Sequence, residues 1–265
     1  MDRENLIVKE AAFPSLCDMF PGTGRFNIIA GPCAVESATQ MEEIAAVLVQ
    51  NNVRFMRGGA FKPRTSPYDF QGLGLEALKI LDYIRQTYGL FIVSEIMEPG
   101  QVENGLRYTD IIQIGSRNMQ NTPLLREVGR TNHPILLKRG MMSTVREFLL
   151  AAEYIAAEGN RKIILCERGI RTFEDATRNT LDISAIAIIQ SETSIPVIAD
   201  LSHSLGRTDI LEPVARGVKA MDVSGIMIEI HNHPAAALSD SKRQLSLRAF
   251  EAFQRKISYM EKVTI

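Results

Sequence analysis

The sequence predicts a single closed (β/α)8 barrel, in which eight parallel strands alternate with helices. Short apolar, β-branched runs recur eight times along the 265 residues. Each run is followed by a turn signal and a helical pattern. The runs are also nearly continuous in apolar residues, which is typical of parallel strands buried on both faces. They cover residues 26–30, 53–57, 91–95, 110–115, 134–138, 162–166, 195–200 and 225–229.

The segments between these runs carry helix signals. Ser37 followed by Gln40, and Thr144 followed by Glu147, have the spacing of capping boxes, in which two side chains satisfy free backbone N–H groups at a helix start. A long apolar periodicity predicts a closing helix over 241–262. These signals fit a helix after each strand, as the barrel requires.

An open doubly wound sheet is the alternative arrangement of the same units. A glycine-rich dinucleotide fingerprint after the first strand would favour it, and the sequence has none there. No linker rich in Ser, Pro or Gly divides the chain. We therefore expect one barrel domain over residues 26–265, preceded by an N-terminal extension over 1–25 that could form a small cap or hairpin across the bottom of the barrel.

The composition is that of an ordinary soluble protein, with 45% hydrophobic residues, 23% charged residues and a formal net charge of −1. This balance argues against a nucleic-acid or membrane partner, and neither a secretory signal nor an apolar run long enough to span a bilayer is apparent. The three cysteines, Cys17, Cys33 and Cys166, form no CxxC pair, so we expect free thiols and a cytoplasmic location.

Basic side chains gather where the strands are expected to end, at the carboxyl face on which barrel enzymes carry their chemistry. One Lys or Arg in a loop is commonly just solvated, but six on one face of a chain with no net positive charge indicate anionic ligands. Two phosphate monoesters and a carboxylate carry roughly −4 to −5 charges, and arginine and lysine suit both groups. The six are Arg57, Lys62, Arg64, Arg117, Lys138 and Arg168.

A second set at the same face has the chemistry of metal ligands. Cys33, His203, Glu229 and Asp240 follow the first, seventh and eighth runs, which lie side by side once a barrel closes. A thiolate, an imidazole and two carboxylates suit Mn²⁺, Fe²⁺, Co²⁺ or Zn²⁺ better than Mg²⁺ or Ca²⁺. Taken singly, a lone cysteine is more often a small buried hydrophobe.

Histidines also support a rival interpretation as a metal-dependent hydrolase. His231 and His233 form a His-x-His pair of the kind found in zinc sites, and Asp200 and His203 are expected nearby, at the end of the seventh run. This hypothesis leaves the six cations unexplained. His133 precedes the fifth run, so we expect it at the bottom face with a structural role.

Eight motifs in chain order resemble the 3-deoxy-D-arabino-heptulosonate 7-phosphate (DAHP) synthases, which catalyse the first step of the shikimate pathway. One motif would be weak evidence, but eight in order on the expected strands are specific. The resemblance runs over about 27–246 and is to the smaller microbial type, without a regulatory domain before the barrel. The motifs are 31–37 (GPCAVES), 57–65 (RGGAFKPRT), 94–98 (SEIME), 113–117 (QIGSR), 137–140 (LKRG), 166–169 (CERG), 200–203 (DLSH) and 238–240 (LSD).

The resemblance implies a (β/α)8 enzyme that joins phosphoenolpyruvate to erythrose 4-phosphate with a divalent metal, as a homodimer or homotetramer. It implies that Cys33, His203, Glu229 and Asp240 bind the metal. Phosphoenolpyruvate would be held by Lys62, Ser116, Arg117, Lys138 and Arg168, supported by Arg57. Erythrose 4-phosphate would be bound by Pro63, Arg64 and Thr65.

The sibling 3-deoxy-D-manno-octulosonate 8-phosphate synthases are the alternative, since they use a similar barrel but take arabinose 5-phosphate. Their counterpart of residues 62–66 typically reads Lys-Ala-Asn-Arg-Ser, whereas this chain has Lys-Pro-Arg-Thr-Ser. Pro63 and Arg64 therefore favour the heptulosonate enzymes.

Three residues are candidates for catalysis itself. Lys62 is expected to transfer protons, because crowding by Arg57 and Arg64 should lower its pKa. Glu95 is expected to orient the attacking water, and His203 to act at the metal centre. A barrel that only binds a phosphate ligand and regulates a partner is the alternative outside enzymes, and loss of a metal-type residue would indicate it.

Overall fold

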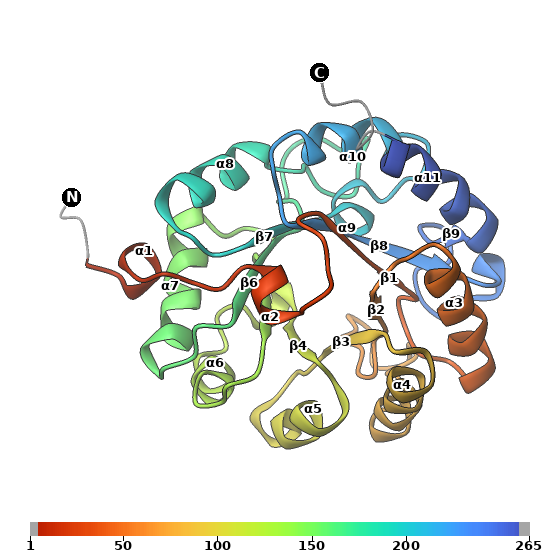
Figure 1. Cartoon of the computed structure of the whole chain (residues 1–265), viewed down its shortest axis with the longest axis horizontal. Helices are drawn as coiled ribbons and strands as arrows, with labels where there is room; N and C mark the ends of the chain where they lie inside the picture. Colours follow the sequence, from red (N-terminus) through yellow and green to blue (C-terminus); the bar gives the residue numbers. More distant parts are fainter. Residues whose placement is uncertain (1–4, 260–265) are drawn as a thin grey trace.

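The computed structural model describes residues 5–259 and shows the predicted closed barrel (Figure 1). Eight strands pair in parallel, each with the next in sequence, and the first closes the ring against the eighth through five register pairs from Asn27↔Gly225 to Gly31↔Glu229. The barrel strands are β1 (Asn27–Gly31), β2 (Phe55–Arg57), β3 (Phe91–Glu95), β4 (Ile111–Ile114), β5 (Ile135–Lys138), β6 (Ile163–Glu167), β7 (Val197–Asp200) and β8 (Gly225–His231).

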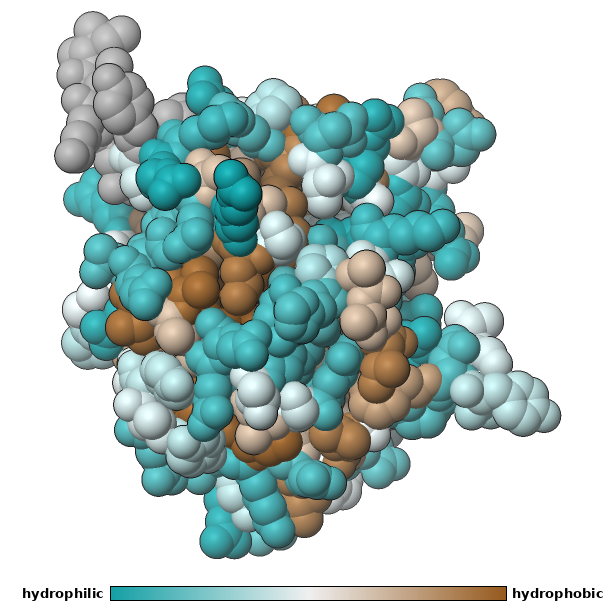
Figure 2. Space-filling view, turned by 90° about the vertical axis from the view of Figure 1, so that its right-hand side faces the viewer, coloured by the Kyte–Doolittle hydropathy of each residue, from teal (hydrophilic) through white to brown (hydrophobic). Residues whose placement is uncertain are grey.

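Helices surround this ring and cover the outer face of its strands (Figure 1). The helices of the barrel are α3 (Ala38–Gln50), α4 (Leu75–Tyr88), α5 (Val102–Tyr108), α6 (Thr122–Gly129), α7 (Val145–Ala157), α8 (Ile183–Glu192), α9 (Leu201–Leu205), α10 (Leu211–Lys219) and α11 (Leu247–Tyr259). Single 3₁₀ turns η1 (Pro99–Gln101), η2 (Ser116–Asn118) and η3 (Pro234–Ala236) lie in the loops. Hydrophilic side chains cover most of the face formed by α3, α4 and α11, with apolar atoms between them (Figure 2).

The predicted helix starts form as the sequence indicates. Ser37 caps α3 by accepting the Gln40 N–H. Thr144 and Glu147 form the full reciprocal capping box at the start of α7. Gln40 does not reach back to Ser37, because its side chain accepts from the Glu36 N–H and donates to the Ala34 carbonyl oxygen instead.

The end of the chain differs from prediction. The closing helix was expected from residue 241, but α11 begins at Leu247. The segment before it extends along β8 as a short parallel strand, β9 (Leu245–Ser246), with Ile230 opposite Leu245. Leu245 is buried by this pairing, and burial of the apolar side chain outweighs helix propensity there. The expected end of the helix near residue 262 lies outside the described residues.

The bottom of the barrel is closed by the N-terminal segment, which carries α1 (Ile7–Glu10) and α2 (Leu16–Met19). In Figure 1, α2 lies across the centre of the ring. Phe20 follows α2 and packs against the rings of Phe55 and Phe91 at centroid distances of 5.2 and 4.9 Å. The inward side chains beneath Leu16 and Phe20 are Ile29, Phe55, Val93, Ile111, Leu136, Ile164, Cys166, Ile198 and Met227.

Cys166 therefore belongs to the apolar interior, as expected for a cysteine within a strand. Apolar side chains fill the lower half of the ring, and the charged side chains of the predicted site lie at the carboxyl ends of the strands and in the loops that follow them. Within residues 5–259, no helix is both long and apolar enough to cross a bilayer.

Candidate active site

A polar pocket of about 220 Å³ opens at the carboxyl ends of the strands. Seven cationic side chains among the described residues line it, against three carboxylates. This excess of positive charge in a chain of net charge −1 is suited to a polyanionic ligand. Twelve of the predicted site residues line the pocket, namely Arg57, Lys62, Pro63, Arg64, Thr65, Glu95, Ser116, Arg117, Lys138, Arg168, His203 and Asp240.

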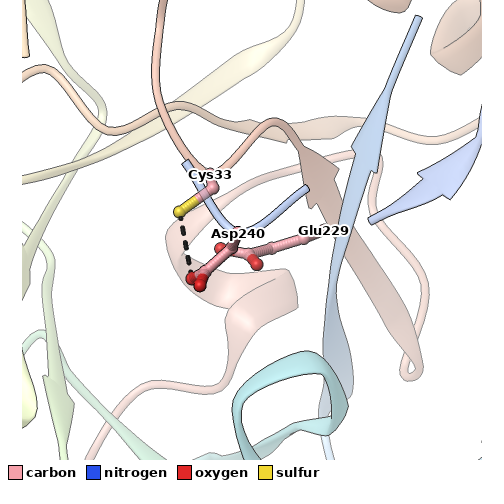
Figure 3. Close-up of side chains that lie close together, drawn as sticks. All are labelled: Cys33, Glu229 and Asp240. Carbon is pink, nitrogen blue, oxygen red and sulfur yellow. Dashed lines mark hydrogen bonds between the residues drawn. The ribbon is translucent and has the colours of Figure 1, made fainter. Parts of the chain in front are cut away.

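The other two predicted residues, Cys33 and Glu229, lie buried beside this pocket. Ligand atoms of Cys33, Glu229 and Asp240 all lie within 4.8 Å of one another, and Figure 3 shows the three side chains turned toward a common point. Cys33 Sγ lies 3.4 Å from Asp240 Oδ2. Three residues from the ends of different strands and loops thus meet, as closure of the barrel predicts.

The donor set fits a divalent cation. Cys33 and Glu229 are 1% and 0% exposed, and Glu229 Oε2 has no hydrogen-bond partner within the described part of the chain. Two carboxylates beside a thiol repel one another unless a cation lies between them. Asp240 also has a φ of +52°, a left-handed backbone conformation that is uncommon outside glycine.

His203 lies next to this group but outside it. Its Nε2 is 3.5 Å from Glu229 Oε1, and its Nδ1 is 2.8 Å from Asp200 Oδ2. Since a carboxylate only accepts, Nδ1 carries the proton and Nε2 is left with a free lone pair. Burial lowers the pKa of His203, although Asp200 and Glu229 oppose the shift. A neutral imidazole oriented by a carboxylate is the usual form of a metal-binding histidine.

Burial also acts on the other two buried ligand candidates. It raises the pKa of the Cys33 thiol to about 11, with Glu229 adding to the effect. For Glu229, burial works in the same direction, but His203, the paired Arg57 guanidinium and Lys62 together hold the pKa of the carboxyl well below its ordinary value. The pKa of Asp240 is lowered as well, so the site holds two ionised carboxylates beside a buried thiol, and a bound metal ion would favour ionisation of that thiol.

Lys62 corrects one prediction. Its pKa is raised, not lowered: burial alone would lower it, but the Cys33 sulfur and the Glu229 carboxylate more than compensate. Its Nζ donates to the Cys33 carbonyl oxygen at 2.9 Å and contacts Cys33 Sγ at 3.0 Å. The sequence argument counted only the neighbouring cations and missed these acidic partners, which come from another strand.

Several of the six cations already have carboxylate partners. Arg57 pairs with Glu229 and Lys138 with Asp200, all four being nearly inaccessible to solvent. The six cations therefore do not all require anions from a ligand, as the sequence argument assumed. Arg117 and Arg168 line the pocket without an ion pair among the contacts that the structure describes.

Glu95 projects into the pocket from the end of β3. Its Oε2 accepts from Gln113 Nε2 at 3.2 Å, while Oε1 has no partner within residues 5–259 although it is buried. A Cβ at Gly115 would lie 2.0 Å from that Oε1. Only glycine at this position leaves room for the carboxylate as it lies here, and both residues line the pocket.

Some residues of the site were not predicted. Gln113, Asp69 and Arg178 line the pocket, and Arg178 lies 3.6 Å from Asp240 Oδ2. Gln113 lies within a quoted motif and could have been found by its place at a strand end. Arg178 lies in the long loop between β6 and α8, where no sequence signal marks it.

The hydrolase hypothesis is wrong in its choice of residues. His231 Nε2 lies 2.9 Å from Gln40 Nε2, and its Nδ1 accepts from the His233 N–H. Asp200 is engaged by Lys138 and His203. Among the described residues, the side chains that could jointly hold a metal are Cys33, Glu229 and Asp240, not the His-x-His pair.

Known proteins are similar to this chain in sequence and in fold. Residues 5–264 match the DAHP synthetase I family. A phospho-2-dehydro-3-deoxyheptonate aldolase of Thermotoga maritima is 51% identical over 248 residues, which cover 94% of this chain and 72% of that relative. A 2-dehydro-3-deoxyphosphooctonate aldolase of Rhodopseudomonas palustris is 31% identical over 251 residues, which cover 87% of this chain and 86% of that relative.

Solved structures agree. The crystal structure of the Thermotoga maritima enzyme, described as a DAHP synthase, matches with a TM-score of 0.86 and 49% identity over 89% of this chain and 69% of that one. A truncated form of that enzyme matches with a TM-score of 0.81 and 48% identity over 90% and 86%. The family matches nearly the whole length of this chain, and about half of the aligned residues are identical to those of the Thermotoga maritima enzyme. This chain is therefore an enzyme of the DAHP synthetase I family.

Proposed function

We propose that this enzyme condenses phosphoenolpyruvate with erythrose 4-phosphate to give DAHP and inorganic phosphate, with a divalent metal. One observation carries the proposal: a strongly cationic pocket adjoins a buried thiol–carboxylate cluster at the carboxyl end of the barrel. Cations alone would suit any phosphate-binding barrel. Their combination with a metal-type cluster is what a reaction between a phosphorylated carboxylate and a phosphorylated aldehyde requires.

Cys33, Glu229 and Asp240 would hold the metal, with His203 as the fourth ligand through its free Nε2. The mixed thiolate, imidazole and carboxylate set suits Mn²⁺, Fe²⁺, Co²⁺ or Zn²⁺. When bound, such an ion supplies a Lewis acid that polarises an aldehyde oxygen. Arg57 supports the centre by pairing with Glu229, and Asp200 by orienting His203.

The remaining pocket residues would bind and orient phosphoenolpyruvate. Arg117 and Arg168 line the pocket, where their planar guanidinium groups match phosphate and carboxylate. Lys138, held by Asp200, adds a fixed positive charge to the same pocket. Cations that are already held in place need not reorient when negative charge develops on the departing phosphate. This electrostatic preorganisation is usually the largest contribution to lowering the activation free energy in such sites.

In the condensation, the methylene carbon of phosphoenolpyruvate would form the new C–C bond to the aldehyde carbon, and the aldehyde oxygen would take up a proton. Glu95 would then orient the water that adds to the resulting cationic central carbon. Glu95 lines the pocket. Gln113 donates to its Oε2, and Oε1 has no partner among the described residues, so it is available to accept a water proton. Lys62 is the candidate donor of the proton to the aldehyde oxygen, since it lines the pocket and its Nζ lies beside the metal-type cluster, 3.0 Å from Cys33 Sγ. The C–O bond to the phosphate then breaks in the tetrahedral adduct, and inorganic phosphate leaves.

The sugar phosphate would bind at the segment from Pro63 to Thr65, which lines the pocket and is partly exposed to solvent. Octulosonate enzymes at 31% identity are relatives too, so arabinose 5-phosphate is the competing substrate. Pro63 and Arg64 differ from the alanine and asparagine that those enzymes typically carry, and we therefore assign the four-carbon aldose phosphate.

Release of phosphate from phosphoenolpyruvate tests the proposal. We expect phosphate with erythrose 4-phosphate and Mn²⁺, little with arabinose 5-phosphate, and none after a chelator has removed the metal. Preference for arabinose 5-phosphate would show that this enzyme catalyses the octulosonate reaction instead. No turnover with either sugar in the presence of Mn²⁺ would instead favour a barrel that only binds phosphates.

A further inference from the structure

One serine connects the two halves of the pocket. Ser239, in the loop between β8 and β9, is 3% exposed. Its Oγ lies 2.7 Å from Arg64 Nη1 and 3.2 Å from Cys33 Sγ. Arg64 belongs to the segment assigned to the sugar phosphate, and Cys33 to the metal centre. The proposed function gives Ser239 no role, yet it touches both.

The direction of these two hydrogen bonds follows from the groups involved. A guanidinium can only donate, so Ser239 Oγ accepts from Arg64. The hydroxyl has one proton, and Cys33 Sγ is its other neighbour in hydrogen-bond contact. A metal-bound cysteine is a thiolate and therefore an acceptor. The chain of bonds runs from Arg64 through Ser239 to the Cys33 sulfur, and such chains strengthen cooperatively.

The backbone around Ser239 is fixed to the same loop as Cys33. Gln244, 5% exposed, accepts the Cys33 N–H at 2.9 Å and donates to the Ser239 carbonyl oxygen at 2.8 Å. Glu36 accepts the Leu238 N–H at 2.9 Å. These bonds join the loops after β1 and β8, so that the position of the Ser239 hydroxyl is set by the scaffold and not by a mobile side chain.

Arg64 has a second, weaker anchor. Its Nη2 and Nε lie 3.2 and 3.4 Å from Asp69 Oδ2, on the exposed side of the loop. Asp69 contacts no metal-type residue among the contacts described. Arg64 is thus held from two sides, by Asp69 near solvent and by Ser239 within the protein. Substitutions at Asp69 and at Ser239 can therefore separate the anchoring of Arg64 from the contact with the Cys33 sulfur.

We propose that Ser239 is a positioning residue that links binding of the sugar phosphate to the metal centre. It holds Arg64 toward the pocket and donates a hydrogen bond to the Cys33 thiolate. This inference rests on the proposed function for the identity of the two ends. The contacts of Ser239 can be tested without turnover. The inference about Ser239 and the proposed function can therefore be contradicted by different measurements.

The test is Ser239→Ala, examined first with Co²⁺ alone. Groups that hydrogen-bond to metal ligands commonly contribute about 10- to 100-fold in metal affinity, so we expect the Kd for Co²⁺ to rise about tenfold. The thiolate-to-cobalt charge-transfer band should move to longer wavelength, because the sulfur loses a hydrogen-bond donor. A purely structural role would not shift this band. Ser239→Gly also lacks the hydroxyl and gives the same test if alanine prevents folding.

Steady-state kinetics then test the contact between Ser239 and Arg64. Ser239→Ala should raise the KM for erythrose 4-phosphate severalfold, whereas the matched control Asp69→Asn should change that KM without altering Co²⁺ affinity or the charge-transfer band. A Ser239 variant with wild-type Co²⁺ Kd, band position and KM would overturn the proposal. If wild-type protein binds Co²⁺ with the thiolate band but turns over neither sugar, the proposed function fails while the Ser239–Cys33 contact remains measurable.

Discussion

The Cys33 sulfur is contacted by side chains from three directions: Lys62 at 3.0 Å, Ser239 at 3.2 Å and Asp240 at 3.4 Å. A buried thiol without a charged role needs no such surroundings. Cys17 offers a contrast within the same chain, because it is half-buried and, among the described residues, its sulfur hydrogen-bonds to the Gly24 carbonyl oxygen at 3.1 Å and to no charged side chain. The two cysteines therefore make a matched pair for mutation.

Cys33→Ala should remove a metal ligand and so lower the amount of bound Mn²⁺. Residues that hydrogen-bond to metal ligands contribute up to roughly 100-fold in activity, and loss of a ligand itself should reduce the rate of phosphate release by more than that. Cys17→Ala, as the control, should keep both near wild type. Metal content measured by atomic emission after gel filtration, together with initial rates, provides the comparison. A Cys33→Ala protein with full metal content and full activity would exclude Cys33 as a ligand.

His133 gives a prediction about pH and stability. It lies at the bottom face, where burial, with Lys162 and Arg85 nearby, lowers its pKa to about 4 from an ordinary value of 6.5. Because the folded pKa is the lower one, the unfolded chain binds this proton first as pH falls. The neutral form therefore stabilises the fold above pH 6.5, and that stability is lost between pH 6.5 and about 4.

The variant His133→Asn should remove this contribution. Urea unfolding at pH 7.5, 5.5 and 4.5 should show wild type losing stability faster than the variant across that window. Other acidic groups titrate in both proteins, so the difference between them isolates His133. Parallel curves for the two proteins would mean that His133 does not contribute.

At the level of elements, the junction of β4 and η2 shapes the pocket. Gly115 ends this strand region, and its missing side chain makes room for the Glu95 carboxylate. The backbone there has φ −69°, which any residue can adopt. The glycine is thus required by the neighbouring carboxylate and not by its own conformation.

Gly115→Ala should displace Glu95 and lower kcat by about 100-fold, at the low end of what a positioned acid–base group contributes, while the protein stays folded. Gly217→Ala in α10 is the control, since an added Cβ meets nothing within 4 Å there; it should keep full kcat. Steady-state kinetics and circular dichroism check both. Unchanged kcat in Gly115→Ala would show that the Glu95 position does not matter for turnover.

The segment after α2 makes a second element-level prediction. Phe20 is 4% exposed and packs on Phe55 and Phe91 at the bottom of the barrel. Phe20→Ala should cost about 3–5 kcal/mol, as for buried phenylalanines in general. Phe173→Ala, at a fully exposed residue, should stay within about 0.5 kcal/mol of wild type. Denaturant unfolding measures both, and equal losses would contradict the packing described.

For the whole molecule, the sequence predicts the barrel and most of the site, because one rule brings distant residues together. Parallel strands in a closed barrel end at one face, so Cys33 and Glu229 had to meet once β1 paired with β8. Strand positions also follow from local patterns, as for β3, where the predicted and observed limits coincide at Phe91 and Glu95.

What the sequence did not predict depends on contacts across the barrel. The raised pKa of Lys62 arises from Cys33 and Glu229, which local crowding by cations could not indicate. The pairing of Lys138 with Asp200 similarly joins β5 to β7. The late start of α11 results from pairing of Leu245 with β8, a tertiary contact that overrides the helical pattern.

The central claim concerns the whole molecule: the cationic pocket and the adjoining metal-type cluster act together in one condensation. The most direct test incubates metal-free protein with phosphoenolpyruvate and erythrose 4-phosphate, adds Mn²⁺, and follows phosphate release and the sugar product by mass spectrometry. We predict no product before Mn²⁺ is added, then one seven-carbon 3-deoxy sugar phosphate per phosphate released. Equal turnover without metal, or phosphate released without that sugar, would contradict the account.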